Sequence, residues 1–386
     1  MAEGIARTYA SGVRCALWPD VDCDAALAFA AANAGPAPVA LLMIFAAATT
    51  DPLQLAAAIG RHFPGARHIA CSTAGEIGPE GYAEDSIVIV SLPQAGFHVS
   101  TLTIENLSGI EFADIARRVG RFRQEHDNTP PEGFAGAEGF ALSFIDGLSR
   151  REELFVSAIH EALEGMPLLG GSTGDDLEFQ RTWCIADGRI LSDCGVLALV
   201  STKHRFTAFR HDNFEPTDVR LVVTDCDQET RTVRELNAAP AAREYAECIG
   251  VAATKLDSMS FASHPVVVKV GGEYYCRSIG HANEDNSLTF FCAVETGVVL
   301  TVSRSLHLVE SARSAFRAVT EETGADFVLG FDCALRRLDA ENRQLKRELS
   351  DVYREHGVIG FNTYGEQFGA MHLNQTFTGL AIGPRV

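Results

Sequence analysis

The chain has 386 residues, is 46% hydrophobic and 22% charged, and carries a formal net charge of −19 at pH 7. This length suffices for two or three domains, and the composition is typical of a folded globular protein rather than a disordered one. The strong negative charge opposes unspecific attraction to nucleic acid or to an anionic membrane, so we expect small-molecule or protein partners.

Several sequence features indicate a cytoplasmic protein. The first 20 residues lack the basic start, apolar core and cleavage site of a signal peptide. The longest apolar run, residues 39–48, is far shorter than the ~20 residues that a membrane helix needs. The ten cysteines are scattered without a C-x-x-C pair, which argues against a zinc ribbon and against covalently attached haem.

The first half of the chain predicts two copies of one unit, in the order strand, helix, strand, turn, strand. A short helix at residues 24–33 precedes them. The elements expected in the first unit are residues 39–45, 52–62, 66–71, 72–76 and 86–92. Those expected in the second are residues 140–145, 152–163, 167–170, 172–175 and 195–201. A hairpin over residues 182–191 is inserted before the last strand of the second unit.

A domain boundary is predicted in the polar stretch 211–218, which contains Pro216. Beyond it, residues 219–224 and 229–236 are expected to form strands and residues 239–248 a helix. Three further runs predict a small antiparallel meander: residues 266–270, 273–278 and 287–291.

The end of the chain predicts a third copy of the unit. Its expected elements are residues 327–331, 334–356, 358–361, 363–366 and 377–382. The long helix over 334–356 has leucines and a valine spaced for one face, namely Leu335, Leu338, Leu345, Leu349 and Val352. We expect that face to pack inside the molecule rather than on a partner helix. Repetition of one unit predicts an α/β (mixed α+β) fold of two lobes with the small meander added.

Each unit carries a turn that combines a threonine, a glycine and a carboxylate within four residues. The turns lie at Ser72 to Glu76, Ser172 to Asp175 and Thr363 to Glu366. A glycine in such a turn permits tight backbone geometry, and the carboxylate can accept backbone N–H groups. Where two turns face each other, their threonine hydroxyls and glycine backbones can also line a ligand pocket.

One turn matches the G-x-S-x-G pattern of a hydrolase nucleophile, over residues 170–174 with Ser172 at its centre. Asp175 or Asp176 together with His372 would complete a Ser/Asp/His triad. However, the residues after Ser172 lead into the predicted hairpin and not into the helix that a nucleophile elbow needs. A serine hydrolase is therefore an alternative and not the favoured function.

The segment Met371, His372 and Asn374 follows the third turn and has no counterpart in the sequences of the other two units. A lone histidine is more often a hydrogen-bonded structural residue, but an imidazole can also be the proximal ligand of a haem. His211, His264 and His281 are weaker candidates of the same kind. The candidate ligand site therefore comprises Met371, His372 and Asn374 with Thr363 and Tyr364 of the adjacent turn, and His372 is the candidate metal ligand.

In motifs that span nearly the whole chain, the sequence resembles the FIST proteins, which have paired FIST N and FIST C sensory domains. The matching motifs are CSTAGE at residues 71–76, DGLS at 146–149, LGGSTGDD at 169–176, ELN at 235–237, GEYYCRSI at 272–279, GFDC at 330–333, TYGE at 363–366 and NQTFT at 374–378. The resemblance implies a FIST N domain over residues 1–215 and a FIST C domain over residues 216–386.

The resemblance also implies a function. The chain is expected to be a bacterial signal-transduction sensor that binds a small ligand and regulates a separate histidine kinase or cyclic-di-GMP enzyme. Stand-alone members similar to the NosP haemoproteins sense nitric oxide, so haem is the expected cofactor, and His372, Asn374, Met371, Thr363 and Tyr364 are the expected site. Association as a homodimer is compatible with the sequence. Two alternatives remain: a hydrolase using Ser172, and an adaptor without a ligand.

Overall fold

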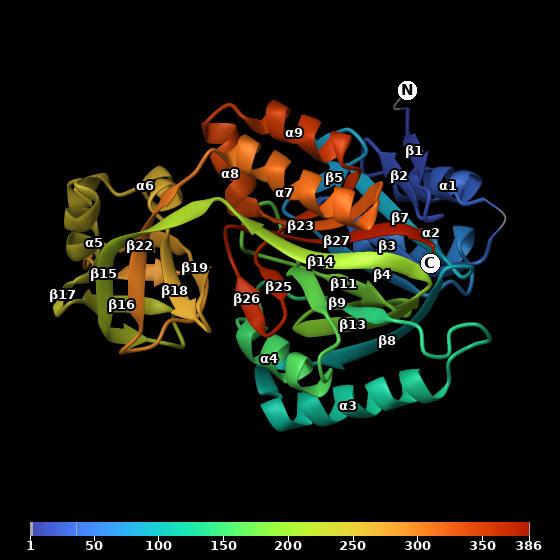
Figure 1. Ribbon diagram of the computed structural model, residues 1–386, viewed down its shortest axis with the longest axis horizontal. Helices are drawn as coiled ribbons and strands as arrows, with labels where there is room; N and C mark the ends of the chain where they lie inside the picture. Colours follow the sequence, from blue (N-terminus) through green and yellow to red (C-terminus); the bar gives the residue numbers. More distant parts are fainter. Residues whose placement is uncertain (1–2, 36, 386) are drawn as a thin grey trace.

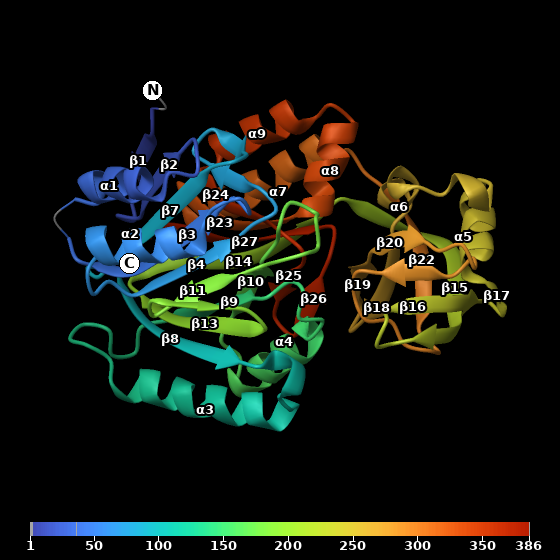
Figure 2. The ribbon, with the colours of Figure 1, turned by 180° about the vertical axis from the view of Figure 1, so that it is seen from behind.

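In the computed structural model, which describes residues 3–35 and 37–385, the chain forms a large body and a small lobe (Figures 1 and 2). The chain leaves the large body after β14 (His204–Asp212) and returns to it before α7 (Leu308–Thr323). The small lobe therefore consists of residues 214–305. The third repeat lies in the large body with the first two.

Three sheets of mixed strand direction make up the large body. The first has the strand order β1 (Ile5–Thr8), β2 (Arg14–Trp18), β7 (Ile87–Pro93), β3 (Val39–Ala46), β4 (His68–Ser72), β11 (Cys184–Ala186), β12 (Arg189–Leu191). The second has the order β26 (Met371–Leu373), β25 (Glu366–Phe368), β10 (Leu168–Ser172), β9 (Gly139–Ile145), β13 (Cys194–Thr202), β8 (Phe97–Glu105). The third has the order β14, β27 (Thr376–Arg385), β23 (Phe327–Cys333), β24 (Val358–Thr363), β5 (Glu76–Gly78), β6 (Gly81–Ala83).

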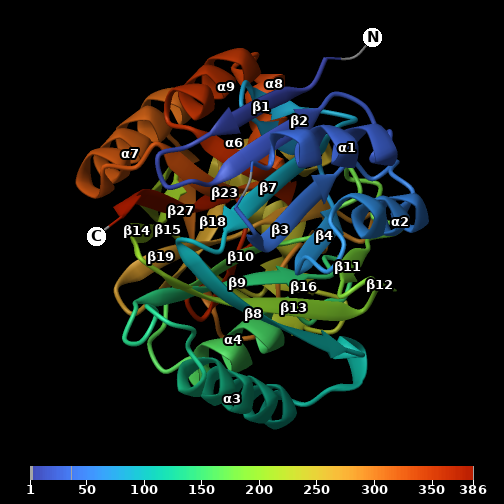
Figure 3. The ribbon, with the colours of Figure 1, turned by 90° about the vertical axis from the view of Figure 1, so that its right-hand side faces the viewer.

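Helices cover the outer faces of the three sheets, as the end-on view in Figure 3 shows. Helices α1 (Cys23–Asn33) and α2 (Pro52–His62) pack on the first sheet, and α3 (Phe112–Asn128) and α4 (Glu152–Ala162) pack on the second. The third sheet is covered by α7 and α9 (Lys346–Glu355), next to α8 (Ala334–Asn342). Short 3-10 turns follow β8 at Leu107–Gly109 and α5 at Ala253–Lys255. None of the helices in the described part of the chain is long and apolar enough to span a membrane.

The inner faces of the three sheets meet in one apolar core that contains a phenylalanine from each repeat. Phe45 of β3 lies 6.3 Å from Phe144 of β9 and 4.7 Å from Phe361 of β24, measured between ring centroids. Phe331 of β23 is 5.9 Å from Phe144. Because these strands are covered by helices outside and by the core inside, both faces are buried, which explains why β3 is a continuous apolar run.

The repeats are interlocked because each sends the hairpin after its turn into the sheet of another repeat. The hairpin β5–β6 of the first repeat pairs with β24 of the third, and β25–β26 of the third pairs with β10 of the second. The hairpin β11–β12 of the second repeat pairs with β4 of the first, which completes the cycle. No repeat therefore has a complete sheet of its own.

Backbone hydrogen bonds between the three turns close the same cycle. The N–H of Ala74 donates to the carbonyl of Asn362 at 2.9 Å, and the N–H of Tyr364 donates to that of Ser172 at 3.3 Å. The N–H of Gly174 donates to the carbonyl of Ser72 at 3.1 Å. We call the three turns, residues 72–76, 172–176 and 362–366, the turn ring.

An eight-stranded antiparallel sheet and two helices form the small lobe. The strand order is β19 (Glu273–Arg277), β18 (Val266–Val270), β22 (Val299–Ser305), β15 (Phe214–Asp227), β16 (Thr232–Leu236), β21 (Leu288–Phe290), β20 (Ile279–Ala282), with β17 (Ala239–Pro240) beside β16. The helices are α5 (Ala241–Ile249) and α6 (Ser258–Ser263). Of the strands predicted as a meander, β18 pairs with β19, whereas β21 pairs with β20 and β16.

The single helix predicted over residues 334–356 is wrong, because the chain forms α8 and α9 with a break between them. Helix α8 ends in a Schellman motif, in which the N–H of Leu345 donates to the carbonyl of Ala340 at 2.7 Å and that of Gln344 to Glu341 at 2.9 Å. Gln344 takes the left-handed position with φ of 60°. Glycine usually occupies that position, so the sequence carried no visible stop signal.

The prediction of a buried apolar face is also wrong for α8. Leu349 and Val352 of α9 are buried as expected, but α8 buries Arg336, Arg337 and Asp339 and leaves Leu335 and Leu338 half-buried. The charged side chains are tolerated inside because each has an ionic partner. The two leucines are available for the cleft between the lobes.

The segment Met371 to Asn374 is likewise not an unrepeated insert. Its first three residues are β26, the second strand of the swapped hairpin, and β6 and β12 occupy the same place in the other repeats. Short edge strands place few demands on side-chain identity, so this part of the repeat is conserved in the backbone and is invisible in the sequence.

Two buried glutamates of the turn ring make the stability of the fold depend on pH. Burial raises the pKa of Glu366 to about 8, against the hydrogen bonds that it accepts from two threonine side chains. Burial likewise raises the pKa of Glu76 to about 7, against the hydrogen bonds that it accepts from a threonine and a serine side chain. Because the pKa values of the two glutamates are raised in the folded protein, the folded protein keeps these protons at pH values at which the unfolded chain has already lost them. The free energy of unfolding is therefore reduced by these groups as pH rises from about 4.5 to about 8.

We predict that Glu366→Gln, which stays neutral, gains stability relative to the wild type by roughly 2–4 kcal/mol between pH 5 and pH 8.5. Urea unfolding at a series of pH values measures this difference. Glu348→Gln, at an exposed position of α9, is the matched control and should run parallel to the wild type. A Glu366→Gln curve parallel to the wild type across this range would show that Glu366 is ionised in the folded protein.

Candidate functional site

The five residues of the predicted ligand site lie close together, but most of them serve the turn ring. Thr363 is fully buried and donates to Glu366, and the Asn374 side chain donates to the carbonyl of Tyr364 at 3.3 Å. Met371 and His372 lie on β26. Of these five residues, Tyr364 alone is among those that line the cavities described below.

His372 is enclosed in this arrangement of the chain. Its side chain is buried, and a Cβ on Gly365 would lie 2.1 Å from the imidazole Cε1, so the ring rests directly on the glycine. Burial lowers the pKa of His372 to about 4, with Glu153 opposing the shift. In the described part of the chain, no group of three or more His, Cys, Asp or Glu side chains is arranged for a metal ion.

These surroundings do not fit a haem bound through His372. An axial histidine must present a ring nitrogen to an open face wide enough for a porphyrin, and His372 borders none of the cavities described here. Its Nδ1 has no hydrogen-bond partner among the described residues, which is consistent with a neutral ring packed for its shape. No step through haem is derived from this site.

The Ser172 hydroxyl is in a structural setting. It is fully buried at the end of β10, where it accepts a hydrogen bond from the Gln367 side chain at 3.0 Å. The chain then continues through the turn ring into β11, as the sequence predicts, and does not form a helix after the serine.

A cleft between the large body and the small lobe has two adjoining chambers. The apolar chamber, of about 180 Å³, lies between α8, α6 and β20. Its lining is mainly aliphatic and aromatic: Leu177, Phe179, Phe261, Ala262, Ile279, Gly280, Phe291, Leu335 and Leu338, with Ser258, Asp339, Asn342 and Gln375 as polar members. Helix α6 and β20 belong to the small lobe, so a molecule held here contacts both lobes.

The second chamber is larger and more polar, with a volume of about 550 Å³. It shares Phe179, Gly280 and Phe291 with the apolar chamber. Its other lining residues are Gly147, Leu148, Arg150, Glu152, Thr230, Arg231, His281, Thr289, Phe290 and Tyr364. Together the chambers have the size and the mixture of apolar walls with a few polar groups that are typical of small-molecule sites.

A loop from the turn ring, residues 176–181, projects an aromatic side chain between the two chambers. Phe179 stacks on Tyr364 at 4.6 Å and on Phe291 of the small lobe at 5.8 Å, measured between ring centroids. Asp176, Leu177 and Phe179 all have positive φ, a conformation that costs residues of this kind of order 1 kcal/mol each. Three such residues within four positions make this loop a candidate for a functional role.

Asp175 holds the strained loop in place. Its carboxylate accepts the backbone N–H groups of Phe179 at 2.9 Å, Gln180 at 2.6 Å and Arg181 at 2.7 Å, and also the Tyr364 hydroxyl. Burial and the Asp175 carboxylate raise the pKa of Tyr364, so the phenol keeps its proton and remains a donor. The predicted residue Tyr364 thus contributes to the cleft by orienting the loop.

An ion cluster closes the cleft on the side of α4. The guanidinium of Arg231, from the small lobe, lies 2.8 Å from the carboxylate of Glu152 and 3.0 Å from that of Glu153 on α4. Glu153 also accepts the backbone N–H of Ala293 at 2.8 Å. These contacts fix one edge of the small lobe on the large body.

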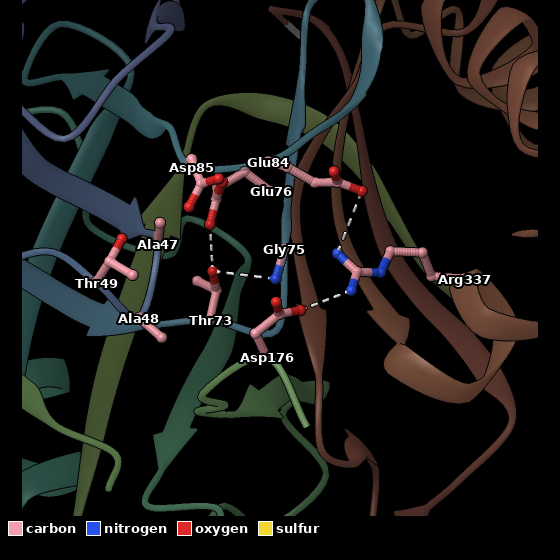
Figure 4. A pocket seen from close by; sticks show the side chains of 10 residues that line it. All are labelled: Ala47, Ala48, Thr49, Thr73, Gly75, Glu76, Glu84, Asp85, Asp176 and Arg337. Atoms are coloured by element: carbon pink, nitrogen blue, oxygen red, sulfur yellow. Dashed lines mark hydrogen bonds and ion pairs between the residues drawn. The ribbon is translucent and has the colours of Figure 1, made fainter. Parts of the chain in front are cut away.

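A separate small cavity, of about 90 Å³, lies against the turn ring on the other side of α8 (Figure 4). In Figure 4, Arg337 reaches toward Gly75 and lies between Asp176 and Glu84. The guanidinium donates to Asp176 at 2.7 Å, and a Cβ on Gly75 would lie 2.3 Å from its Nη1. Burial lowers the pKa of Arg337, but the bond to Asp176 and the nearby Glu341 outweigh it.

Arg337 therefore ties together side chains from all three repeats, since Glu84 follows β6, Asp176 follows β10 and Arg337 itself lies on α8. The cavity has room for a few water molecules, at about 30 Å³ each in the liquid. It is much smaller than the cavities that enclose drug-sized ligands, so the interlobe cleft is the candidate site.

The sequence did not reveal most of the cleft. Phe179 and Phe291 follow no period in the sequence, and Leu335 and Leu338 were assigned to an internal stripe. One available signal was the pair of consecutive arginines, Arg336 and Arg337, inside a predicted apolar helix. Another was the histidine candidate His281, which lines the polar chamber.

The comparison with known proteins agrees with the repeated motifs. Models of the FIST N domain and the FIST C domain match residues 40–239 and 241–369. An uncharacterized protein of Methanocaldococcus jannaschii is 26% identical over 196 residues, which cover 49% of this chain and 36% of that protein. The chain thus matches only about a third of the length of this curated relative.

Among solved structures, a cyanuric acid hydrolase aligns with 97% of this chain and with all of its own. The TM-score of 0.37 and the sequence identity of 10% are too low to support an argument about this protein. The two family models cover most of the chain between them. The chain belongs to the FIST family, whose domains are sensor domains of signal transduction.

Proposed function

We propose that this chain is a cytoplasmic ligand sensor of a bacterial signalling pathway, in which a small molecule in the interlobe cleft changes the position of the small lobe. A separate histidine kinase or cyclic-di-GMP enzyme would read that change. The observation that carries the proposal is the cleft itself, whose walls come from both lobes and meet at a strained aromatic loop.

The connection between the lobes is suited to a hinge. The chain crosses between them twice, and the two crossings pair with each other, with Phe214 opposite Ser305. The N–H of Leu306 donates to the carbonyl of Asn213 at 2.7 Å. A ligand that contacts both lobes can shift their arrangement by as much as its affinities for the two arrangements differ.

Helix α8 connects the cleft with the hinge. Leu335 and Leu338 line the apolar chamber, while the buried Arg336 points the other way and donates to Asn213 of the hinge at 2.9 Å and to Asp332 at 2.8 Å. Asp332 also accepts the hydroxyl of Tyr353 at 2.9 Å. A movement of α8 would therefore reach both the hinge and the core of the third repeat.

We predict that the fluorescent probe anilinonaphthalene sulfonate binds the native protein in this cleft. Leu338→Asp, which places a negative charge in the apolar chamber, should repel the anionic probe and weaken binding at least about tenfold. Leu53→Asp is the matched control, because this leucine is 71% exposed on α2, and it should bind like the wild type. Equal affinities of both variants would place the probe outside the cleft, and no binding at all would favour a ligand-free adaptor.

A second measurement tests whether binding in the cleft affects the hinge between the lobes. Hydrogen exchange of α8 and of the crossing at residues 212–214 should slow when the probe binds, because the ligand restrains both lobes. Exchange that slows only in the loop 176–181 would show binding without transmission to the hinge.

Haem with nitric oxide as signal remains the ligand that the family resemblance implies. The enclosure of His372 gives a specific expectation: a Soret band acquired on addition of haem should be unchanged in His372→Ala, measured by visible spectroscopy. Loss of the band in a variant whose circular dichroism matches the wild type would show that His372 becomes accessible and ligates the iron.

A further inference from the structure

We infer that the ligand of the interlobe cleft is an amphiphilic carboxylate, with its apolar part in the apolar chamber and its carboxylate in the polar chamber. This inference rests on the proposed function and adds the chemical class of the ligand. Three features support this ligand class: the apolar side chains of α8, the position of the two chambers beside each other, and the placement of the charged side chains that line them.

The apolar end is defined by side chains that the fold leaves without a core partner. Leu335 and Leu338 are half-buried although α8 buries its charged residues. Phe261 and Ile279 of the small lobe face them across the chamber. Apolar surface of this kind gains about 25 cal/mol for each Å² that a ligand removes from water.

The two chambers adjoin, because three residues line both of them, and we place one molecule across this boundary. Phe179 and Phe291 stack at the junction, and Gly280 lies beside them in both chambers. A Cβ on Gly280 would come within 3.2 Å of the Phe291 ring, so a side chain there would crowd the passage. A chain-like or planar apolar group can pass the junction in contact with the ring faces.

The charges favour an anionic end in the polar chamber. Its charged lining residues are Arg150, Arg231 and Glu152, and because Arg231 is already paired with two carboxylates, the positive charge available to a ligand there is that of Arg150. Arg231 is occupied by Glu152 and Glu153, whereas Arg150 is solvent-exposed. A guanidinium is suited to a carboxylate because its parallel N–H groups match the two oxygens.

The orientation of the ligand in the cleft follows from the charge that lines the apolar chamber. Asp339 lines the apolar chamber, and its carboxylate accepts the Nε of Arg343 at 2.8 Å. A ligand carboxylate beside it would be repelled by the Asp339 carboxylate. The aromatic rings would also attract a cation, but a cation in the polar chamber would meet Arg150 and Arg231.

Isothermal titration calorimetry with octanoate and octanamide tests the inference on the intact protein, because the two probes share one tail and differ in head charge. Octanoate should bind at least about tenfold more tightly than octanamide. Arg150→Gln should reduce octanoate affinity to the level of octanamide and leave octanamide unchanged. Arg121→Gln, at an exposed position of α3, should leave both affinities as in the wild type.

The outcomes separate this inference from the proposed function. Equal affinity for the two probes, or octanoate binding that survives Leu338→Asp, would overturn the carboxylate. Failure of both probes while anilinonaphthalene sulfonate still binds in a Leu338-dependent way would also overturn it, and would leave the cleft as the ligand site. Failure of all three probes would overturn both proposals.

Discussion

The arrangement of this protein depends on the hydrogen bonds that close the turn ring. Each turn donates a backbone N–H to the next, from Ala74, Tyr364 and Gly174, and the N–H groups of Asn362 and Ser172 donate in the opposite direction. Each repeat also gives its following hairpin to a neighbouring sheet. Removing one repeat would leave backbone donors, acceptors and sheet edges of both others without partners. The three repeats are therefore one cooperative unit, although they come from distant parts of the sequence.

The turn ring also determines what can be functional. The glycines and threonines that attract attention in the sequence are committed to it, and buried Glu76 and Glu366 are bonded within their own repeats. The second repeat differs, because Asp175 holds an extra loop that carries Phe179 into the cleft. The proposed ligand site lies where the symmetry of the repeats is broken.

Helix α8 contributes both to the turn ring and to the cleft. Arg337 faces the turn ring, Arg336 faces the hinge, and Leu335 and Leu338 face the cleft. Buried arginines are costly unless paired, and here each has a carboxylate partner. Their pairing turns the apolar side of the helix outward, toward the second lobe. A helix with contacts on three sides can respond to a ligand only by changing those contacts together.

The sequence by itself determined the repeats, their order of strand, helix, strand, turn and strand, and the FIST family, because apolar periodicity and turn chemistry are local. It also singled out Tyr364, which lines the polar chamber. Only the tertiary structure decided the exchange of hairpins, the break at Gln344 and the cleft between Phe179, Phe291 and Leu338. These depend on pairings between residues far apart in the chain and on which face of α8 finds ionic partners, and a single sequence does not encode either as a local pattern.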